Sequence, residues 1–293
     1  MKRNAISLSL LLVASLACEL AGTPPTGQVD DVATVVAKTM AALPTVEGPA
    51  AEPSPAFTGR TVEFQGGNLT IPPGLVASVS QAVISPASGP EVPPWEVTPG
   101  HIELTLDGYA LQGTFHTPKI YIFPAQSADL PPGAVDNINL LQSLLANPGQ
   151  SLGEKDLPSI PFFNAGAVFV AKEKLIQFQN GAGVRMLTQY AQSFAKVNNH
   201  ELFYHFQGLS NDRRTYFIAI LPVSAATLPA DASETAALPA GGVPFPGYAD
   251  PNADFLGYYS AVTENLNALP EEAFNPSLTV LDALIASLLV SSP

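Results

Sequence analysis

Cysteine is almost absent from this sequence, since Cys18 is the only one among 293 residues. An internal disulfide is therefore excluded, and so is any metal or redox site that needs a pair of cysteines. Charged residues are also scarce, at 13% of the chain, which is about half the usual share. Walker, Rossmann and CxxC motifs are missing, so the sequence carries none of these nucleotide-binding or redox signatures.

Positive charge is the scarcer of the two signs. The chain has 12 Lys and Arg against 25 Asp and Glu, a net charge of −13 at pH 7. Such a chain should repel nucleic acid, so we expect no nucleic-acid partner. Most of the basic residues lie between Gln150 and Val223. We interpret them as edge lysines and turn arginines that keep a sheet soluble, with an anion-accepting patch as the alternative.

The chain begins with the pattern of an export signal. Lys2 and Arg3 precede an apolar run, Ile6 to Leu16, that is too short for a typical membrane-spanning helix. We therefore predict a signal peptide over residues 1–17. Its end, Ser-Leu-Ala followed by Cys18, resembles a bacterial lipoprotein signal, in which the cysteine takes the lipid. This resemblance implies an exported protein held at the cell membrane or outer surface by a lipid on Cys18, with ordinary signal cleavage as the alternative.

Proline, in contrast, is abundant. Its 29 residues are roughly double the usual share. Six of them fall in residues 18–56, which we interpret as the lipid anchor and a flexible stalk. The remainder, 57–293, is long enough to bury one core, and we predict a single domain with many irregular loops.

The clearest strand pattern lies in the second half of the chain. The runs ELFYHFQG (201–208) and TYFIAILP (215–222) flank a polar turn, which predicts a β-hairpin. Both faces of the hairpin are largely apolar, so we expect it at the centre of a sheet that is covered on both sides. If the hairpin closes about Asp212, Phe206 faces Ile218.

The rest of the chain supplies more strands and three helices. Further strands are predicted at 61–64, 68–71, 76–84, 101–106, 119–123, 162–171, 175–179 and 184–190, and helices at 134–147, 254–269 and 276–289. The strands at 175–179 and 184–190 extend the hairpin into a four-strand antiparallel meander, and Asn275 is expected to cap the last helix. This order predicts an α+β fold, an antiparallel β-sheet meander covered by helices.

Two family resemblances accompany this pattern. Leu69 to Gly74 (LTIPPG) and the closing amphipathic helix resemble the Mog1/PsbP-like sandwich. Gly183 to Tyr190 (GVRMLTQY) and Asn198 to Leu209 (NNHELFYHFQGL) resemble segments of exported bacterial lipoproteins. The first resemblance implies a sandwich fold and a role as an assembly factor. The second implies a location outside the cytoplasm but brings no activity with it.

Motifs with catalytic potential occur in unsuitable contexts. The segment 149–153 (GQSLG) matches the nucleophile-elbow pattern, but a helix precedes it and polar residues follow, whereas the chemistry needs a strand before and a helix after the serine. His200 and His205 are five residues apart, so they cannot form the zinc pair of a zincin helix. His101 and Glu103 share one face of a strand, which we interpret as an exposed strand face because no third metal ligand is in view.

A calcium loop is suggested only in part. Asp250, Asn252 and Asp254 match the first three ligand positions, but Phe255 and Ala261 stand where an EF-hand needs glycine and glutamate. A looser site that adds Glu264 remains the alternative. We therefore assign no catalytic residue, no metal site and no cofactor.

A ligand pocket is predicted between the meander and the loop 239–254. Phe245 and Tyr248 would line an apolar wall there, and Arg185, His205 and Gln207 would orient a polar ligand. The leading hypothesis is a lipid-anchored, non-catalytic binding or interaction module outside the cytoplasm, with an envelope protein or a small ligand as its partner.

Two other functions stay open. An extracytoplasmic hydrolase would use His101 with Glu103, or His205, in a cleft. An assembly or scaffolding factor of an envelope complex is the role that the Mog1/PsbP-like resemblance implies.

Overall fold

The computed structural model describes residues 59–93, 95–126, 130, 132–147 and 164–290. The predicted signal peptide, stalk and lipidated Cys18 lie outside the described residues. So does the serine of the GQSLG segment.

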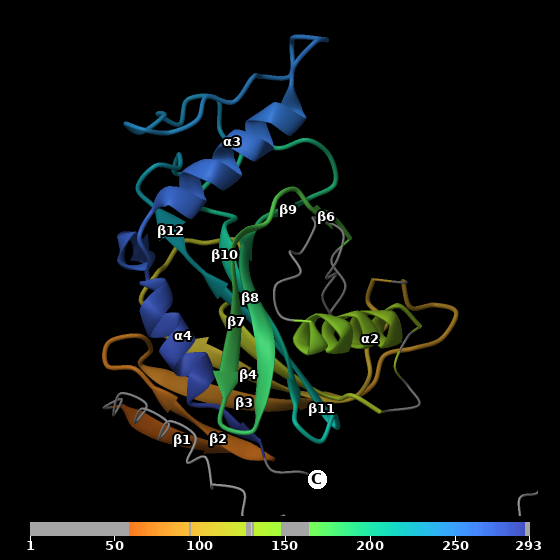
Figure 1. The fold of residues 1–293 in the computed structure, drawn as a ribbon. Coiled ribbons are helices and arrows are strands. Elements are labelled where there is room, and N and C mark those ends of the chain that lie inside the picture. The colour runs from red at the N-terminus through yellow and green to blue at the C-terminus, as the bar shows by residue number, and fades with distance from the viewer. Residues whose placement is uncertain (1–58, 94, 127–129, 131, 148–163, 291–293) are drawn as a thin grey trace, which may run out of the picture. The chain divides into compact units, whose positions relative to one another are not determined.

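A seven-stranded antiparallel sheet forms the centre of the described part (Figure 1). Its strands, in spatial order, are β3 (Ser78–Ile84), β4 (His101–Asp107), β5 (Lys119–Pro124), β11 (Thr215–Pro222), β10 (Phe203–Ser210), β8 (Gly181–Thr188) and β7 (Ala171–Phe178). The β-branched and aromatic runs predicted as strands supply most of this sheet. The predicted meander is confirmed, because β11, β10, β8 and β7 are neighbours in this order.

Helices cover both faces of the sheet, so the α+β prediction is confirmed at this level. One face packs against α3 (Phe255–Ala268) and α4 (Leu278–Ala286), and the other packs against α2 (Pro132–Ala146). Figure 1 shows α2 on one side of the sheet, and α3 and α4 on the other. Every residue of β10 and β11 is buried, which confirms the central place of the hairpin.

Smaller sheets complete the structure. Strands β1 (Arg60–Phe64), β2 (Gly67–Ile71) and β14 (Leu289–Val290) form a three-stranded sheet. β12 (Ser224–Ala225) pairs with β13 (Phe274–Asn275), and β6 (Gly166–Ala167) pairs with β9 (Tyr190–Ala191). A short 3₁₀ helix, η1 (Glu271–Ala273), precedes β13. The end of the chain thus returns to the strands with which the described part begins.

The predicted register of the central hairpin is wrong by one residue. Phe206 lies opposite Ala219, and Ile218 lies opposite Gln207. The prediction placed one residue at the centre of the turn, whereas four residues, 211–214, separate the two strands. Arg213 has a φ of 59°, a left-handed conformation that the residue pattern did not reveal. Because side chains alternate between faces, this shift moves Ile218 to the face that α2 covers.

The last predicted helix is shorter than expected at both ends. Its N-cap is Ser277, not Asn275, which belongs to β13. The helix ends at Ala286, and Leu289, the last residue of the predicted helix, begins β14 instead. Leu289 and Val290 pair with β2, so a tertiary contact ends the helix earlier than the residue pattern predicts.

The turn between β7 and β8 also differs from the prediction. It was expected at residues 180–183, but β8 already begins at Gly181. Gly183 instead lies opposite Gly208 within the sheet. A Cβ on Gly183 would lie 2.3 Å from the backbone oxygen of Gln207, so this glycine permits a close approach rather than a turn.

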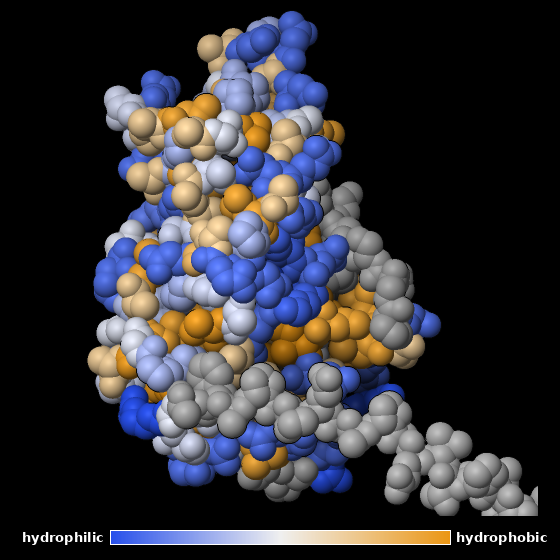
Figure 2. All heavy atoms as spheres, turned by 60° about the vertical axis from the view of Figure 1, so that its left-hand side comes forward, coloured by the Kyte–Doolittle hydropathy of each residue, from blue (hydrophilic) through white to orange (hydrophobic). Residues whose placement is uncertain are grey.

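The surface combines hydrophilic residues with separate hydrophobic patches. Figure 2 shows hydrophobic residues at the surface in its upper part, where α3 and the loop before it lie. Among the described residues, no helix is long and apolar enough to cross a membrane.

Candidate functional site

A pocket of about 460 Å³ lies at one end of the large sheet. Its wall comes from the turn between β1 and β2, the end of β3, the start of β4, the end of β5, the start of β11, and β14. We call it the sheet-end pocket. It is lined by Gln65, Gly66, Val83, Ile84, Ser85, Pro86, Gly100, His101, Ile102, Ile122, Phe123, Pro124, Arg214, Thr215 and Val290.

Apolar side chains on neighbouring strands form one side of this pocket. Val83 of β3 pairs with Ile102 of β4, which pairs with Ile122 of β5. Paired residues of antiparallel strands point to the same face, so the three side chains form a row. Exposure rises along this row, from 7% for Ile122 to 65% for Val83. The row thus runs from the core out to the edge of the sheet, where the pocket has an apolar mouth.

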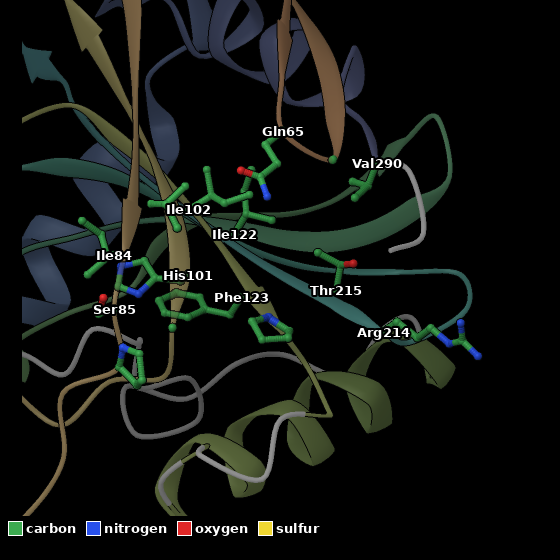
Figure 3. A pocket seen from close by; sticks show the side chains of 15 residues that line it. Gln65, Ile84, Ser85, His101, Ile102, Ile122, Phe123, Arg214, Thr215 and Val290 are labelled. Carbon is green, nitrogen blue, oxygen red and sulfur yellow. The ribbon is translucent and has the colours of Figure 1, made fainter.

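Uncharged polar groups complete much of the wall. In Figure 3 the side chain of Gln65 lies close to Ile102 and Ile122, and the guanidinium of Arg214 points away from them. Thr215 and Ser85 add hydroxyl groups. A largely apolar cavity with a few polar groups is the usual form of a small-molecule site.

His101 is the one imidazole in the pocket wall, and it is buried, with 6% exposed. The prediction of an exposed strand face is therefore wrong for this residue. Its ring lies 4.5 Å from the ring of Phe123, centre to centre. The Nδ1 atom lies 2.8 Å from the carbonyl oxygen of Pro99, and Nε2 lies 3.4 Å from Oε1 of Glu103. Both partners only accept hydrogen bonds, so each ring nitrogen of His101 has an acceptor atom beside it.

Glu103 is held from its other side by a lysine. Nζ of Lys119 lies 2.5 Å from Oε2 of Glu103. His101 and Glu103 thus lie within hydrogen-bond reach, as the hydrolase hypothesis requires, but both are already engaged in structural contacts. No hydroxyl of a described residue is hydrogen-bonded to His101. Among the described residues, the contacts to Pro99 and Glu103 thus occupy both ring nitrogens of His101, whereas a general base needs one of them free.

The five residues predicted to bind a ligand do not meet in one place. Arg185 points to the face of the sheet that carries α3 and α4, whereas His205 and Gln207 point to the face that carries α2. The register explains this separation, since Arg185 pairs with Phe206 and His205 pairs with Met186. The sheet itself therefore divides the predicted set.

Arg185 serves an internal ion network. Only 1% of its side chain is exposed, and its Nη2 lies 2.6 Å from Glu271 and 3.3 Å from Asp282. Lys174 reaches the same two carboxylates at 3.2 and 3.0 Å. Burial alone raises the pKa of Glu271, but the hydrogen bonds from Arg185 and Lys174 outweigh it and lower that pKa below its ordinary value. Arg185, which was predicted to orient a polar ligand, thus binds two carboxylates of the protein through Nη2, while its Nε and Nη1 are buried without a hydrogen-bond partner.

His205 belongs to a buried polar chain below α2. The hydroxyl of Tyr216 donates to the amide oxygen of Gln207, and the amide nitrogen of Gln207 lies 3.3 Å from Nε2 of His205. The amide nitrogen donates, so Nε2 must accept and the ring proton sits on Nδ1. That Nδ1 is buried without a hydrogen-bond partner. Burial lowers the pKa of His205 to about 3, with a further contribution from His116.

Phe245 and Tyr248 lie together, as predicted, but in a different setting. Their rings are 4.9 Å apart, and both lie near Phe255 at the start of α3. Phe194 stacks on Phe255 at 4.4 Å. A shallower cavity of about 350 Å³ adjoins Phe194 and Leu256. Neither Phe245 nor Tyr248 lines that cavity.

The acidic loop before α3 has a structural role. Asp254 caps the helix by accepting from the backbone N–H of Gly257 at 2.8 Å, and Asp250 accepts from the N–H of Asn252. Within the ranges that the structure describes, no group of three or more His, Cys, Asp or Glu residues is arranged to hold a metal ion.

The sheet-end pocket was missed because its wall comes from six separate segments. Only the pairing of β4 with both β3 and β5, and the return of β14 to β2, brings these segments together. The one local signal is in β3, where two adjacent apolar residues, Val83 and Ile84, end a strand that begins with alternating serine and valine. No protein-family model and no curated protein matches the chain. Comparisons with known proteins therefore assign no ligand to the sheet-end pocket.

Proposed function

We propose that this protein is an exported, lipid-anchored binding module whose sheet-end pocket receives the apolar part of a ligand. The observation that carries this proposal is the pocket itself, with its row of Val83, Ile102 and Ile122. Its volume lies within the range of about 300 to 1,000 Å³ that is typical of ligand sites. Export and the anchor on Cys18 rest on the signal pattern of residues 1–17.

The absence of a free cation in the apolar row favours an uncharged ligand group. Lys119 is paired with Glu103 and does not line the pocket, and the guanidinium of Arg214 points away from the row (Figure 3). With a net charge of −13, the chain as a whole disfavours anionic ligands. An alkyl chain, an aromatic ring or an apolar amino-acid side chain fits this environment.

We also propose that the fold is a sandwich of the Mog1/PsbP-like type. The LTIPPG segment forms the end of β2 and the turn after it, in which the N–H of Leu75 bonds to the carbonyl of Pro72 at 3.2 Å. The closing helix α4 packs in the same core as β2. These features match the two segments on which the resemblance rests.

The binding test uses the full mature chain and a neutral fluorescent probe, N-phenyl-1-naphthylamine. Val83→Asp introduces a charge at the pocket mouth, at a side chain that is 65% exposed. We expect this variant to bind the probe at least tenfold more weakly, a change of about 1.4 kcal/mol. Leu256→Asp is the matched control, since Leu256 is 68% exposed and lies on α3.

The two variants separate the outcomes. Weakened binding in Val83→Asp with unchanged binding in Leu256→Asp supports the proposal. No binding to the parent chain, or equal affinity in Val83→Asp and the parent, would overturn it.

A further inference from the structure

β3 is an edge strand that lacks the usual protection. In the sheet order its one neighbour among the described strands is β4. Its sequence, SVSQAVI, has no charged residue and no proline, and its residues are exposed or half-buried. Natural edge strands normally carry lysines, prolines or bulges, or are covered, because an open edge invites pairing with another chain.

The opposite edge of the same sheet shows these devices. β7 contains Lys172, Glu173 and Lys174, and its register with β8 shifts between Ala171 and Lys174. Helices α3 and α4 pack beside it, and Nζ of Lys172 bonds to the backbone oxygen of Asn267 in α3 at 3.0 Å. The β7 edge is therefore protected by charged residues, by a shift in register and by helices. At the β3 edge, Arg60 donates to the carbonyl oxygen of Ala77 at 3.3 Å and the N–H of Gln65 donates to the side chain of Gln81 at 2.9 Å, but no described strand pairs with its outer side.

The open edge leads directly into the sheet-end pocket. Val83 and Ile84 are the last residues of β3, and Ser85 and Pro86 continue the pocket wall. A strand that paired with β3 would carry side chains on alternate faces. One of those side chains would reach the apolar row of Val83, Ile102 and Ile122. Backbone pairing and a side-chain pocket together are the elements of peptide recognition by strand addition.

Acidic residues flank this edge at both ends. Asp107 pairs with Ser78 at the start of β3. Glu91 and Glu96 are exposed on the loop that follows β3. Arg60 also reaches the start of β3, where its Nη2 donates to the carbonyl oxygen of Ala77 at 3.3 Å, so three acidic residues stand against one basic residue at these ends. Between them the strand itself is neutral. The charge pattern therefore complements a segment that is uncharged in the middle and basic at its ends.

We propose that the β3 edge binds an extended segment of a partner polypeptide as an eighth strand, with one apolar side chain in the sheet-end pocket. The segment has β-branched residues at its centre and Lys or Arg at its ends. This inference rests on the proposed function, since it names the class of ligand that enters the same pocket. Peptide binding in this mode also requires backbone hydrogen bonds with β3, which a free apolar ligand does not need.

A second copy of this chain is a poorer occupant than a basic partner. Antiparallel pairing of two β3 strands about Gln81 would place Ser78 opposite Ile84 of the other copy. Asp107 of one copy would then approach the acidic loop of the other, and like charges in such positions oppose association. Charge complementarity therefore favours a different polypeptide.

The test uses synthetic peptides of about eight residues, with arginine at each end and threonine alternating with valine or isoleucine between. Two further peptides carry N-methyl groups on alternate amides, one on the odd positions and one on the even positions. Only one set of amides in a strand points toward a given neighbour. We expect the parent peptide and one methylated peptide to bind the full mature chain, and the other methylated peptide to bind at least tenfold more weakly.

Two variants locate the site. Ser80→Lys with Ala82→Lys places charges on exposed positions of β3 that do not line the pocket. We expect this variant to weaken peptide binding at least tenfold and to leave the binding of N-phenyl-1-naphthylamine unchanged. Val83→Asp should weaken both. Thermal unfolding of each variant verifies that it is folded.

The results of these experiments distinguish strand addition, pairing with a second copy, and failure of the proposed function. Failure of all the peptides while the probe still binds would overturn strand addition and leave the proposed function standing. Equal binding of the two methylated peptides would also overturn it, because side chains alone would then carry recognition. A dimer of the parent chain in light scattering that Ser80→Lys with Ala82→Lys dissociates would assign the edge to a second copy instead. Failure of the probe as well would overturn both proposals.

Discussion

The guanidinium of Arg185 and the carboxylate of Glu271 form an ion pair of 2.6 Å across 86 residues of sequence. Arg185 lies in β8 and Glu271 in η1, so the pair ties the meander to the C-terminal elements. Asp282 of α4 joins the same network and also accepts from the hydroxyl of Tyr204 at 3.0 Å. The C-terminal helices are therefore held to the sheet by buried charge as well as by apolar packing.

Asp282→Ala should destabilise the protein by about 3 kcal/mol, because it removes a partner from a buried arginine. Urea unfolding measures this change. Asp136→Ala is the control, since Asp136 is an exposed acidic residue on α2 and should change stability by less than about 0.5 kcal/mol. Equal stability of the two variants would show that the network contributes nothing to the fold.

Acid should destabilise the fold through two histidines. Burial lowers the pKa of His205 to about 3 and that of His116 to about 4, with an added contribution from His200 in the second case. The unfolded chain then takes up protons first, so stability is lost as the pH falls from about 6.5 toward 4. For His205 the loss by pH 4 is on the order of 3 kcal/mol.

The variant His205→Met isolates this contribution. Glu271, whose pKa is lowered, also loses its stabilising effect in acid, so the comparison between variant and parent is the informative quantity. We expect the variant to show a shallower dependence of unfolding free energy on pH between 6.5 and 4. An identical slope in both proteins would mean that His205 does not titrate on unfolding.

Ile218→Asp should abolish folding. Ile218 is fully buried in β11, the central strand of the sheet, and an unpaired carboxylate there has no solvent or cation to compensate it. Expression as a soluble protein with a cooperative thermal transition would disprove this. Val83→Asp also replaces a β-branched apolar side chain with aspartate, but at an exposed position, and this variant should stay folded.

Gly183→Ala should destabilise the protein by about 1 to 3 kcal/mol. A Cβ on Gly183 would lie 2.4 Å from the ring of Phe206, and still closer to the backbone of β10. Gly166→Ala is the matched control, since nothing lies within 4 Å of a Cβ there. Thermal unfolding distinguishes the two, and equal melting temperatures would contradict the close approach of β8 and β10.

Cys18→Ser tests the anchor. If Cys18 carries a lipid, this variant should leave the membrane fraction and appear in the soluble fraction of the expressing cells. The parent protein, expressed at the same level, is the control. Unchanged membrane retention of the variant would show that a lipid on Cys18 does not hold the protein at the membrane.

The order of strands in the meander followed from residue patterns, because the apolar runs from 175 to 222 are each about one strand long and are separated by clear turns. The register did not follow, because it depended on the backbone of Arg213. The small strand β14 did not follow either, since Leu289 was expected to end the closing helix and its strand conformation comes with the pairing to β2. The residue pattern therefore revealed neither the left-handed conformation of Arg213 in the turn nor the tertiary pairing of β14 with β2.

The candidate site was less predictable than the fold. Arg185, His205 and Gln207 stood out because polar residues inside an apolar strand are unusual, and the structure uses the three in internal contacts. The sheet-end pocket is formed by ordinary apolar residues such as Ile102 and Ile122, which no sequence pattern distinguishes from core. Its position depends on which strands lie side by side at one end of the sheet.

Methyl NMR tests the binding site most directly. Isoleucine methyl groups are labelled in the full mature chain, and the spectrum is followed as N-phenyl-1-naphthylamine is added. We expect shifts for Ile84, Ile102 and Ile122, which line the sheet-end pocket, and none for Ile138 or Ile220, which pack against α2. Shifts at Ile138 and Ile220 with none at the three pocket residues would contradict the account.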